Sequence, residues 1–209
     1  MGTTFYIAVE DDLSDAVVRR LLNHVRRGFQ VRARYPLSPL SYFKPELSGY
    51  GYLKTNIQAF NAAAVETSHL LLTDLDISPC ALELIQDWAG GDLHPNFIFR
   101  VAVREVEGWL LADRDNFADF LGLNTAQIPA NVEAIAQAKE EIVNLARLSP
   151  NDEIRDNLVP RVGSTATTGR LFTRTLIGYV RNFWEIEEAA NNANSLARAL
   201  RALHTFKPV

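Results

Sequence analysis

The sequence predicts an α/β protein: a three-layer, Rossmann-like sandwich with a mostly parallel sheet of about four strands and a helical C-terminal extension. Short runs rich in Ile, Val, Leu and Phe recur in the first half of the chain, and such runs are typical of strands buried on both faces of a parallel sheet. Helical patterns separate them, which indicates right-handed βαβ crossovers. Strand patterns fade from residue 114 onward. We therefore expect an α/β core over residues 1–113 and a helical region packed on it over residues 114–209.

The expected elements alternate along the core. Strands are expected over residues 4–9, 29–35, 69–74 and 97–103, and helices over 13–28, 53–65 and 79–89. The first helix places Leu13, Val17 and Leu21 on one face. A loop with Pro36, Pro39 and Pro45 follows the second strand. In the C-terminal region we expect helices over 131–148 and 190–204, helical turns near 115–122 and 171–181, and a loop over Gly163–Gly169.

The charge is distributed unevenly along an otherwise ordinary globular composition. Of the 209 residues, 47% are hydrophobic and 22% are charged. Residues 1–154 carry a net charge of −8, whereas residues 155–209 carry +4. This division suits a metal-dependent enzyme that grips a polyanion, and it equally suits a helical tail with solvated arginines.

Several classes of protein are disfavoured by what the sequence lacks. No apolar run reaches about 18 residues, so we expect no membrane span and no membrane partner. The single cysteine, Cys80, cannot form an intramolecular disulfide and favours a reducing, cytoplasmic location. Neither a GxxxxGK[ST] phosphate loop nor a Rossmann glycine fingerprint is present, so the chain is not expected to be an NTPase or a dehydrogenase by those routes.

Two acidic clusters stand where apolar strand patterns end. Glu10, Asp11 and Asp12 follow the first strand, and Asp74 and Asp76 follow the third. Ligands of open α/β sheets gather at the carboxyl ends of the strands. Carboxylates that meet there repel one another unless a cation lies between them, and Mg²⁺ (or Mn²⁺) prefers such oxygen ligands. The sequence therefore predicts a metal site at this edge.

A third acidic pair, Glu105 and Glu107, follows the fourth strand. Both side chains can point at the site if the chain is still extended there, but only one can if a helix has begun. Two metal ions held by such carboxylates are the usual apparatus for phosphodiester cleavage. The alternative is structural: Asp11 or Asp12 caps a helix, and Asp74 and Asp76 initiate a turn.

The acidic pattern resembles a Toprim domain, the metal-binding fold of topoisomerases, primases and overcoming-lysogenization-defect nucleases. The matching residues are Glu10 at the end of the first strand and Asp74-Leu75-Asp76 at the end of a later one. Residues 100–113, with Glu107 two before Trp109, are similar to a bacterial Toprim-like domain of unknown function found in suspected phage-defence loci. The resemblance covers roughly residues 4–113. One departure is Asp11, which stands where Toprim domains usually have glycine.

The resemblance implies a magnesium-dependent nuclease, or a related phosphotransfer enzyme, that acts on DNA or RNA. It implies Glu10, Asp74, Asp76 and Glu107 as catalytic residues, and Glu10, Asp74 and Asp76 as metal ligands. The position of Asp11 and Glu105 at the strand ends adds these two residues as further candidate ligands. It also implies a role in antiviral defence with a separately encoded ATPase, and it is compatible with a homodimer.

A non-catalytic signalling module is the alternative, and its sharpest form is a response-regulator receiver domain. There an acidic pair holds Mg²⁺ and an aspartate, here Asp74, accepts a phosphoryl group. Against it, the fourth strand ends in Val103-Arg104-Glu105 rather than in Ser or Thr, and no lysine follows at a fifth strand end. Glu105 and Glu107 would also repel a phosphoryl group.

Five basic residues are candidates for contact with nucleic acid. Lys54 follows Gly49-Tyr50-Gly51-Tyr52, which could form a flexible glycine loop with stacking aromatics or simply pack on the sheet edge. Arg104 adjoins the acidic site and could clamp a phosphate or neutralise Glu105 and Glu107. The others flank the Gly163–Gly169 loop and are Arg161, Arg170 and Arg174.

Overall fold

A parallel sheet forms the centre of the computed structural model, which describes residues 3–25, 28–35 and 49–209. Within these residues four strands pair in the order β2-β1-β3-β4, all parallel. They are β1 (Thr4–Val9), β2 (Gln30–Tyr35), β3 (Ser68–Asp74) and β4 (Phe97–Ala102). The prediction of a Rossmann-like α/β fold with a helical C-terminal part is confirmed. The expected loop with Pro36, Pro39 and Pro45 lies outside the described residues.

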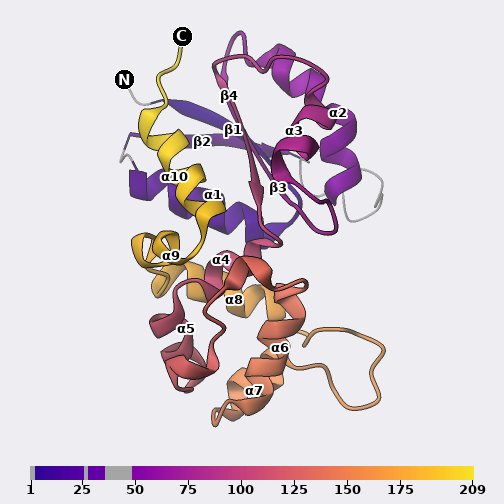
Figure 1. The fold of residues 1–209 in the computed structure, drawn as a ribbon, viewed down its shortest axis with the longest axis vertical. Helices are drawn as coiled ribbons and strands as arrows, with labels where there is room; N and C mark the ends of the chain where they lie inside the picture. The colour runs from indigo at the N-terminus through magenta and orange to yellow at the C-terminus, as the bar shows by residue number, and fades with distance from the viewer. Residues whose placement is uncertain (1–2, 26–27, 36–48) are drawn as a thin grey trace.

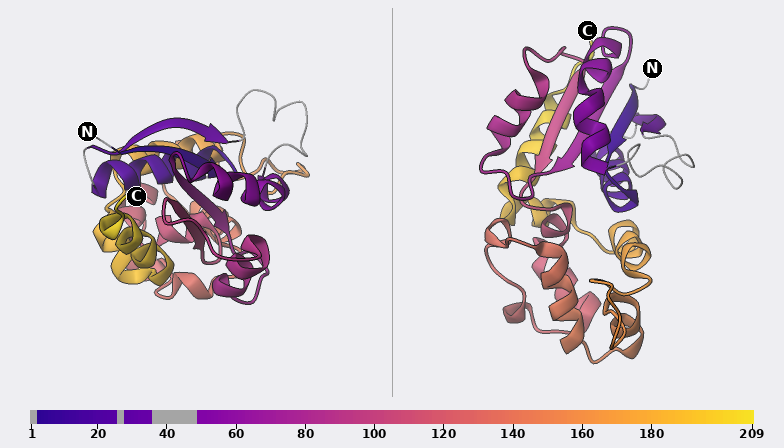
Figure 2. Two further views of the ribbon diagram at one scale, coloured as in Figure 1. Left: turned by 90° about the horizontal axis from the view of Figure 1, so that it is seen from above. Right: turned by 90° about the vertical axis from the view of Figure 1, so that its right-hand side faces the viewer.

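Helices cover both faces of the sheet and complete three layers (Figures 1 and 2). One face carries α1 (Asp12–Val25) and α10 (Asn194–Thr205), and the other carries α2 (Gly49–Ala63) and α3 (Ala81–Ala89). Because alternate strand residues point to opposite faces, Ile7 and Val9 belong to the first core and Ala8 to the second. The central strands β1 and β3 therefore present apolar residues to both faces, as their sequences predict.

The remaining helices lie beyond the carboxyl ends of the strands (Figure 1). They are α4 (Val106–Leu111), α5 (Arg114–Leu121), α6 (Ala138–Leu148), α7 (Asp152–Leu158), α8 (Phe172–Asn182) and α9 (Ile186–Asn192). The helix expected over 131–148 is in fact a 3-10 turn at Val132–Ala134 followed by α6, and the helix expected over 190–204 is α10, preceded by α9 and a break at Ala193. The chain thus turns more often than its apolar pattern predicts.

The C-terminal helices share a continuous core with one face of the sheet. Trp109, Tyr179 and Trp184 are fully buried there with strand residues such as Ile7. Asp113 anchors three helices, because its Oδ2 accepts hydrogen bonds from Tyr179 Oη and the Glu185 N–H, both at 2.8 Å. The pKa of Tyr179 is raised by burial and by the neighbouring Asp113 carboxylate. The tertiary core therefore extends from the sheet into the helical part.

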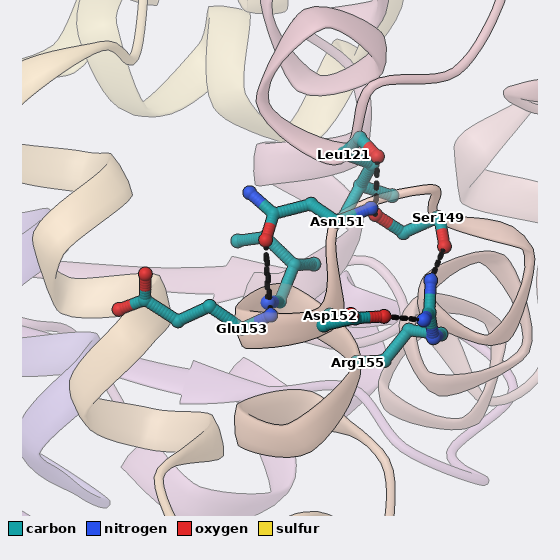
Figure 3. A network of polar contacts seen from close by, with 7 residues as sticks. Leu121, Ser149, Asn151, Asp152, Glu153 and Arg155 are labelled. Atoms are coloured by element: carbon teal, nitrogen blue, oxygen red, sulfur yellow. Dashed lines mark hydrogen bonds and ion pairs between the residues drawn. The ribbon is translucent and has the colours of Figure 1, made fainter.

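A polar network fixes the corner between α6 and α7 (Figure 3). Asn151 Oδ1 caps α7 by accepting the Glu153 N–H at 2.9 Å, and Ser149 Oγ donates to the Leu121 carbonyl at 2.6 Å. Arg155 donates to the Ser149 carbonyl and pairs with Asp152. These contacts satisfy backbone groups that the helix ends leave unpaired. They hold the end of α6 against α5.

Candidate active site at the carboxyl edge of the sheet

The topological switch point of the sheet lies between β1 and β3. The chain leaves β1 toward β2 on one side, whereas β3 is followed by β4 on the other. In open α/β sheets this divergence opens a crevice beyond the strand ends. β1 and β3 pair directly, up to Val9 against Leu72. The two acidic clusters therefore emerge from neighbouring strands at the place where such folds bind ligands.

Glu10 and Asp74 are in direct contact across this switch point. Glu10 Oε1 accepts the Asp74 N–H at 2.9 Å and the hydroxyl of the buried Thr73. Asp74 Oδ1 accepts the N–H of Val106, the first residue of α4, at 2.9 Å. Hydrogen bonds thus fix one oxygen of each carboxylate, and they join the ends of β1, β3 and β4 at one position. The expected meeting of Glu10 with the Asp-x-Asp segment is what the fold produces.

Asp76 lies in a turn beyond the strand rather than in the strand itself. Its φ is +48°, in the left-handed region that aspartate tolerates better than most residues. Its N–H donates to the Arg104 carbonyl at 3.0 Å, and Arg104 Nη1 donates to the Asp76 carbonyl at 3.2 Å and to the Ser78 carbonyl at 2.8 Å. Arg104 therefore holds the turn that carries Asp76, and this turn keeps Asp76 close enough to raise the pKa values of Glu10 and Asp74.

Glu105 and Glu107 diverge because α4 begins between them. Glu105 is the extended N-cap residue of α4, and its Oε2 accepts the N–H of Lys139 on α6 at 2.7 Å. Glu107 lies in the first turn, is only 2% exposed, and has Oε1 3.4 Å from Lys139 Nζ. Glu107 Oε2 is buried and has no hydrogen-bond partner within the part of the chain that the structure describes. Glu107 thus turns into the acidic cluster, whereas Glu105 reaches the edge formed by α6.

Asp11 caps α1 and also belongs to the cluster of carboxylates. Its Oδ1 accepts the Ser14 N–H at 2.8 Å, which caps α1. Its charge nevertheless raises the pKa values of Glu10, Asp74 and Glu107. Asp12 is different, because it is exposed and pairs with Arg34 on β2. We call the set that converges here the acidic edge: Glu10, Asp11, Asp74, Asp76 and Glu107.

Burial and mutual repulsion raise the pKa values of three members of the acidic edge. Burial is the main cause for Glu10, and hydrogen bonds from Thr73 and Asp74 oppose it. The pKa of Asp74 lies well above its usual value, first through burial and then through the charges of Glu10 and Glu107. Burial raises the pKa of Glu107 to about 7, although Lys139 opposes the shift. Such an edge favours protons or an added cation.

Two adjoining grooves run from the acidic edge to the helical part. The first, of about 720 Å³, is lined by Asp76, Arg104 and Gln137 among others. The second, of about 680 Å³, is lined by Lys139, Arg147, Arg161 and Thr167 among others. Glu105 and Gln137 line both grooves, so the second groove adjoins the first. The loop over residues 159–171, which projects beside α6 in Figure 1, provides its far side.

The five basic residues that we expected to contact nucleic acid lie in different parts of the structure. Lys54 does not follow a flexible glycine loop: Gly49 already begins α2, and Lys54 Nζ pairs with Asp87 on α3 at 2.8 Å. The prediction of a loop was wrong. Leu53, Ile57 and Phe60 form a buried apolar face, and its packing outweighs the low helix propensity of Gly49 and Gly51. Arg104 lines the first groove. The remaining candidates are exposed, with Arg161 in the second groove, Arg170 in a neighbouring groove of about 610 Å³, and Arg174 on α8.

Lys139 and Arg147 are the groove residues that sequence reasoning missed. Lys139 is 32 positions from Glu107 in the chain, and no spacing rule links an isolated lysine to a glutamate at that separation. Both basic residues lie on α6, which packs on α4 beyond the carboxyl edge of the sheet (Figure 1). The only indication from the sequence that Lys139 and Arg147 could lie near the acidic edge was the expectation that the region after residue 113 packs on the core.

Comparisons with known proteins leave the chain without an assigned family. No family model matches it, no curated protein matches it, and no solved structure matches it. Across residues 3–25, 28–35 and 49–209, no group of three or more His, Cys, Asp or Glu side chains is arranged so that it could hold a metal ion. No helix in this part of the chain is long and apolar enough to cross a membrane.

Proposed function

We propose that the protein is a divalent-cation-dependent phosphodiesterase, a nuclease or related phosphotransfer enzyme, that acts on DNA or RNA at the acidic edge. The observation that carries this proposal is the hydrogen bond from the Asp74 N–H to the Glu10 carboxylate at the switch point, beside a buried Glu107 oxygen that has no partner among the described residues. The groove that leads to Arg147 and Arg161 supports a polyanionic substrate. The Toprim resemblance of Glu10, Asp74 and Asp76 points to the same chemistry.

The donor set suits Mg²⁺ or Mn²⁺, although the side chains are not preorganised around an ion. All candidate donors are carboxylate oxygens, which these hard cations prefer. One oxygen each of Glu10 and Asp74 is engaged by backbone N–H groups, so the second oxygen of each carboxylate is the donor that we propose for an ion. The raised pKa values of Glu10, Asp74 and Glu107 support the proposal, because a nearby cation favours the charged form of a carboxylate.

Each residue of the acidic edge has a role that follows from its position. Glu10, Asp74 and Asp76 would hold the cation, with Asp11 and Glu105 at its margin. Glu107, with a pKa of about 7, is suited to accept or donate a proton near neutral pH. Arg104 would place a phosphate at the rim of the first groove. A bound divalent cation activates water and stabilises the leaving oxygen in such enzymes.

The decisive test compares the wild type with Asp74→Ala. Plasmid DNA and RNA are incubated with Mg²⁺ or Mn²⁺, and Mn²⁺ affinity is measured by calorimetry. We expect wild-type cleavage to require the cation, and we expect Asp74→Ala to lose cleavage by at least about a hundredfold together with Mn²⁺ binding. Asp119→Ala, on the exposed side of α5, is the matched control. Equal cleavage by Asp74→Ala and wild type would refute the site.

A receiver-like phosphoacceptor is the second candidate, because the order β2-β1-β3-β4 with an aspartate at the end of β3 also occurs in flavodoxin-like signalling domains. Glu107 argues against it, since its carboxylate lies close enough to raise the pKa of Asp74 and would repel a phosphoryl group there. Labelling of Asp74 by acetyl phosphate would favour the receiver. A role in antiviral defence and a separate ATPase belong to the proposal through the resemblance alone. A cytoplasmic location belongs to it through the single cysteine, Cys80, and a homodimer remains part of the proposal without a supporting contact.

A further inference from the structure

Two fully exposed apolar side chains line the grooves beside the acidic edge. Among the large apolar residues that the structure describes, Ile77 and Val162 are the most exposed, at 99% and 107% of their reference areas. Apolar residues scattered singly over a surface are common and need no explanation. These two, which we call the apolar tips, are not scattered: Ile77 lines the first groove and Val162 lines the second. Because the two grooves adjoin, one ligand can meet both tips.

The first apolar tip stands at the centre of a turn whose position is fixed by hydrogen bonds. The Ser78 N–H donates to the Leu75 carbonyl at 2.9 Å and closes the turn around Asp76 and Ile77. Leu75 is buried, and its N–H donates to the Arg104 carbonyl at 2.9 Å. Arg104 Nη1 donates to the carbonyls of Asp76 and Ser78, on either side of Ile77. The backbone beneath Ile77 is therefore held in place while its side chain is fully exposed.

The second apolar tip stands on a closed turn within the 159–171 loop. The Ser164 N–H donates to the Arg161 carbonyl at 3.0 Å and closes the turn around Val162 and Gly163. Gly163 has a φ of +81°, which glycine adopts without strain. Both tips thus occupy the centre of a turn, where Gly, Pro, Asn, Asp and Ser are the usual residues and β-branched apolar residues are not. Their side chains are not explained by the needs of the turns that carry them.

An apolar side chain in a polar groove selects one part of a nucleic acid. It gains free energy by removing apolar surface from water, and a phosphate offers it no such surface. The faces of the bases do, but in a duplex they are stacked on one another, whereas in a single strand they are open to contact. A side chain on a fixed turn also loses little conformational entropy when it makes the contact. The apolar tips therefore suit unpaired bases.

We propose that Ile77 and Val162 contact the bases of single-stranded nucleic acid, so that the two grooves take a single strand in preference to a duplex. This inference narrows the substrate class of the proposed function and rests on that function's choice of nucleic acid. In the second groove Arg147 and Arg161 hold phosphates by charge, while the tips pack against bases. Ile77 directly follows Asp76, so its contact positions the strand at the acidic edge.

The first test uses the wild type without a divalent cation, so that binding is separated from cleavage. Fluorescence anisotropy measures its affinity for a labelled, hydrolysis-resistant phosphorothioate oligonucleotide, as a single strand and as a blunt duplex of the same length. Charge alone favours the duplex, which carries more phosphates per unit length. We expect the single strand to bind at least about tenfold more tightly at equal salt, because only its bases are open to the tips. Equal affinities, or tighter binding of the duplex, would overturn the inference.

Substitutions test the two tips one at a time. Ile77→Ser and Val162→Ser each remove apolar surface but no charge, so each should weaken single-strand binding about fivefold and leave the slope of log affinity against log salt unchanged. The unchanged slope distinguishes a base contact from a lost phosphate contact. Ile77→Leu keeps the apolar surface and should stay within about twofold of the wild type. Leu82→Ser and Val65→Ser are the matched controls, because both residues are 61% exposed and neither lines either groove.

The outcomes separate this inference from the proposed function. If Ile77→Ser and Val162→Ser bind the single strand as tightly as the wild type does, the base contact is wrong, and cleavage that depends on Asp74 still stands. If Asp74→Ala cleaves as well as the wild type while the tip variants lose single-strand affinity, the catalytic assignment fails and the base contact stands. If the wild type binds neither form of the oligonucleotide, nucleic acid is not the substrate and both proposals fail.

Discussion

The acidic edge and the helical wall opposite it differ in how their charged groups are held. On the acidic edge, Glu10 and Asp74 accept hydrogen bonds from backbone N–H groups at strand and helix ends, and Glu107 is buried. On the helical wall, which we define as Lys139, Arg147, Arg161 and Thr167, three of the four residues are exposed and Lys139 is half-exposed.

The difference between the two regions follows from what each is proposed to bind. Carboxylates that bind a cation need exact placement, whereas basic groups that bind a polyanion need only their charge. Carboxylates that bind a cation must converge, and the backbone of a parallel sheet imposes that convergence. Groups that hold a polyanion work through charge at a surface, and they tolerate loops and long side chains. Substitutions in the acidic edge should therefore change metal binding and pH dependence. Substitutions of Arg147, Arg161 or Thr167 should change nucleic-acid binding alone, whereas Lys139 contacts Glu107 and belongs to both sides.

The largest expected effect is a pH dependence of stability that belongs to the acidic edge. The folded-state pKa of Glu107 is about 7, above its ordinary value of 4.5, so the native state binds more protons than the unfolded state between these values. The free energy of unfolding must then fall as pH rises through this window, by about 3 kcal/mol from this residue. Urea denaturation of the metal-free protein at pH 5 and pH 8 measures it.

Glu107→Gln isolates that contribution, because glutamine cannot titrate. Its unfolding free energy should change less between pH 5 and pH 8 than that of the wild type. Saturating Mn²⁺ should also flatten the wild-type dependence, since the cation binds the deprotonated carboxylates. If the wild type and Glu107→Gln lose equal stability over this range, Glu107 is not the buried titrating group.

An intermediate effect is expected from Gly169, which positions the helical wall. Gly169 closes the 159–171 loop onto α7, and a Cβ added there would lie 2.2 Å from the Asn157 carbonyl oxygen. Gly169→Ala must displace this loop, with a loss of roughly 1–3 kcal/mol in the free energy of unfolding. Oligonucleotide affinity should fall while Mn²⁺ affinity stays unchanged.

Gly178→Ala is the matched control for Gly169→Ala. Gly178 lies inside α8, and an added Cβ would meet nothing within 4 Å. Alanine in a helix is favoured over glycine by roughly 0.5–1 kcal/mol, so this variant should be more stable than the wild type. Loss of Mn²⁺ binding in Gly169→Ala would show that the acidic edge and the helical wall are not independent.

The smallest effect is expected from Arg161, an exposed residue of the helical wall. Arg161→Gln should weaken binding of the oligonucleotide about threefold and lower the slope of log affinity against log salt by about one. Fluorescence anisotropy over a series of salt concentrations measures both. Arg201→Gln, exposed on α10, is the control and should leave the slope unchanged. A normal slope in Arg161→Gln would remove this residue from the interface.

Particular elements show how far local pattern reasoning reaches. The four strands were predicted to within a residue. Apolar runs buried on both faces indicated β1, β3 and β4, whereas alternating polar and apolar residues indicated the edge strand β2. Helix α7 was not predicted, although Asn151 before Asp152 and Glu153 is a recognisable start signal, because seven residues give too short an apolar period. The break at Ala193 was also missed, since an apolar period carries across a short interruption between α9 and α10.

The sequence by itself determined the parallel sheet and the carboxylates that end its strands, because these depend on neighbours along the chain and on the geometry shared by all such sheets. Only the tertiary structure decided that Glu107 turns into the cluster while Glu105 caps α6, and that Lys139 meets Glu107. Those contacts depend on how α4 and α6 pack across the carboxyl edge. Packing between distant segments is set by the whole core, so no local spacing records it.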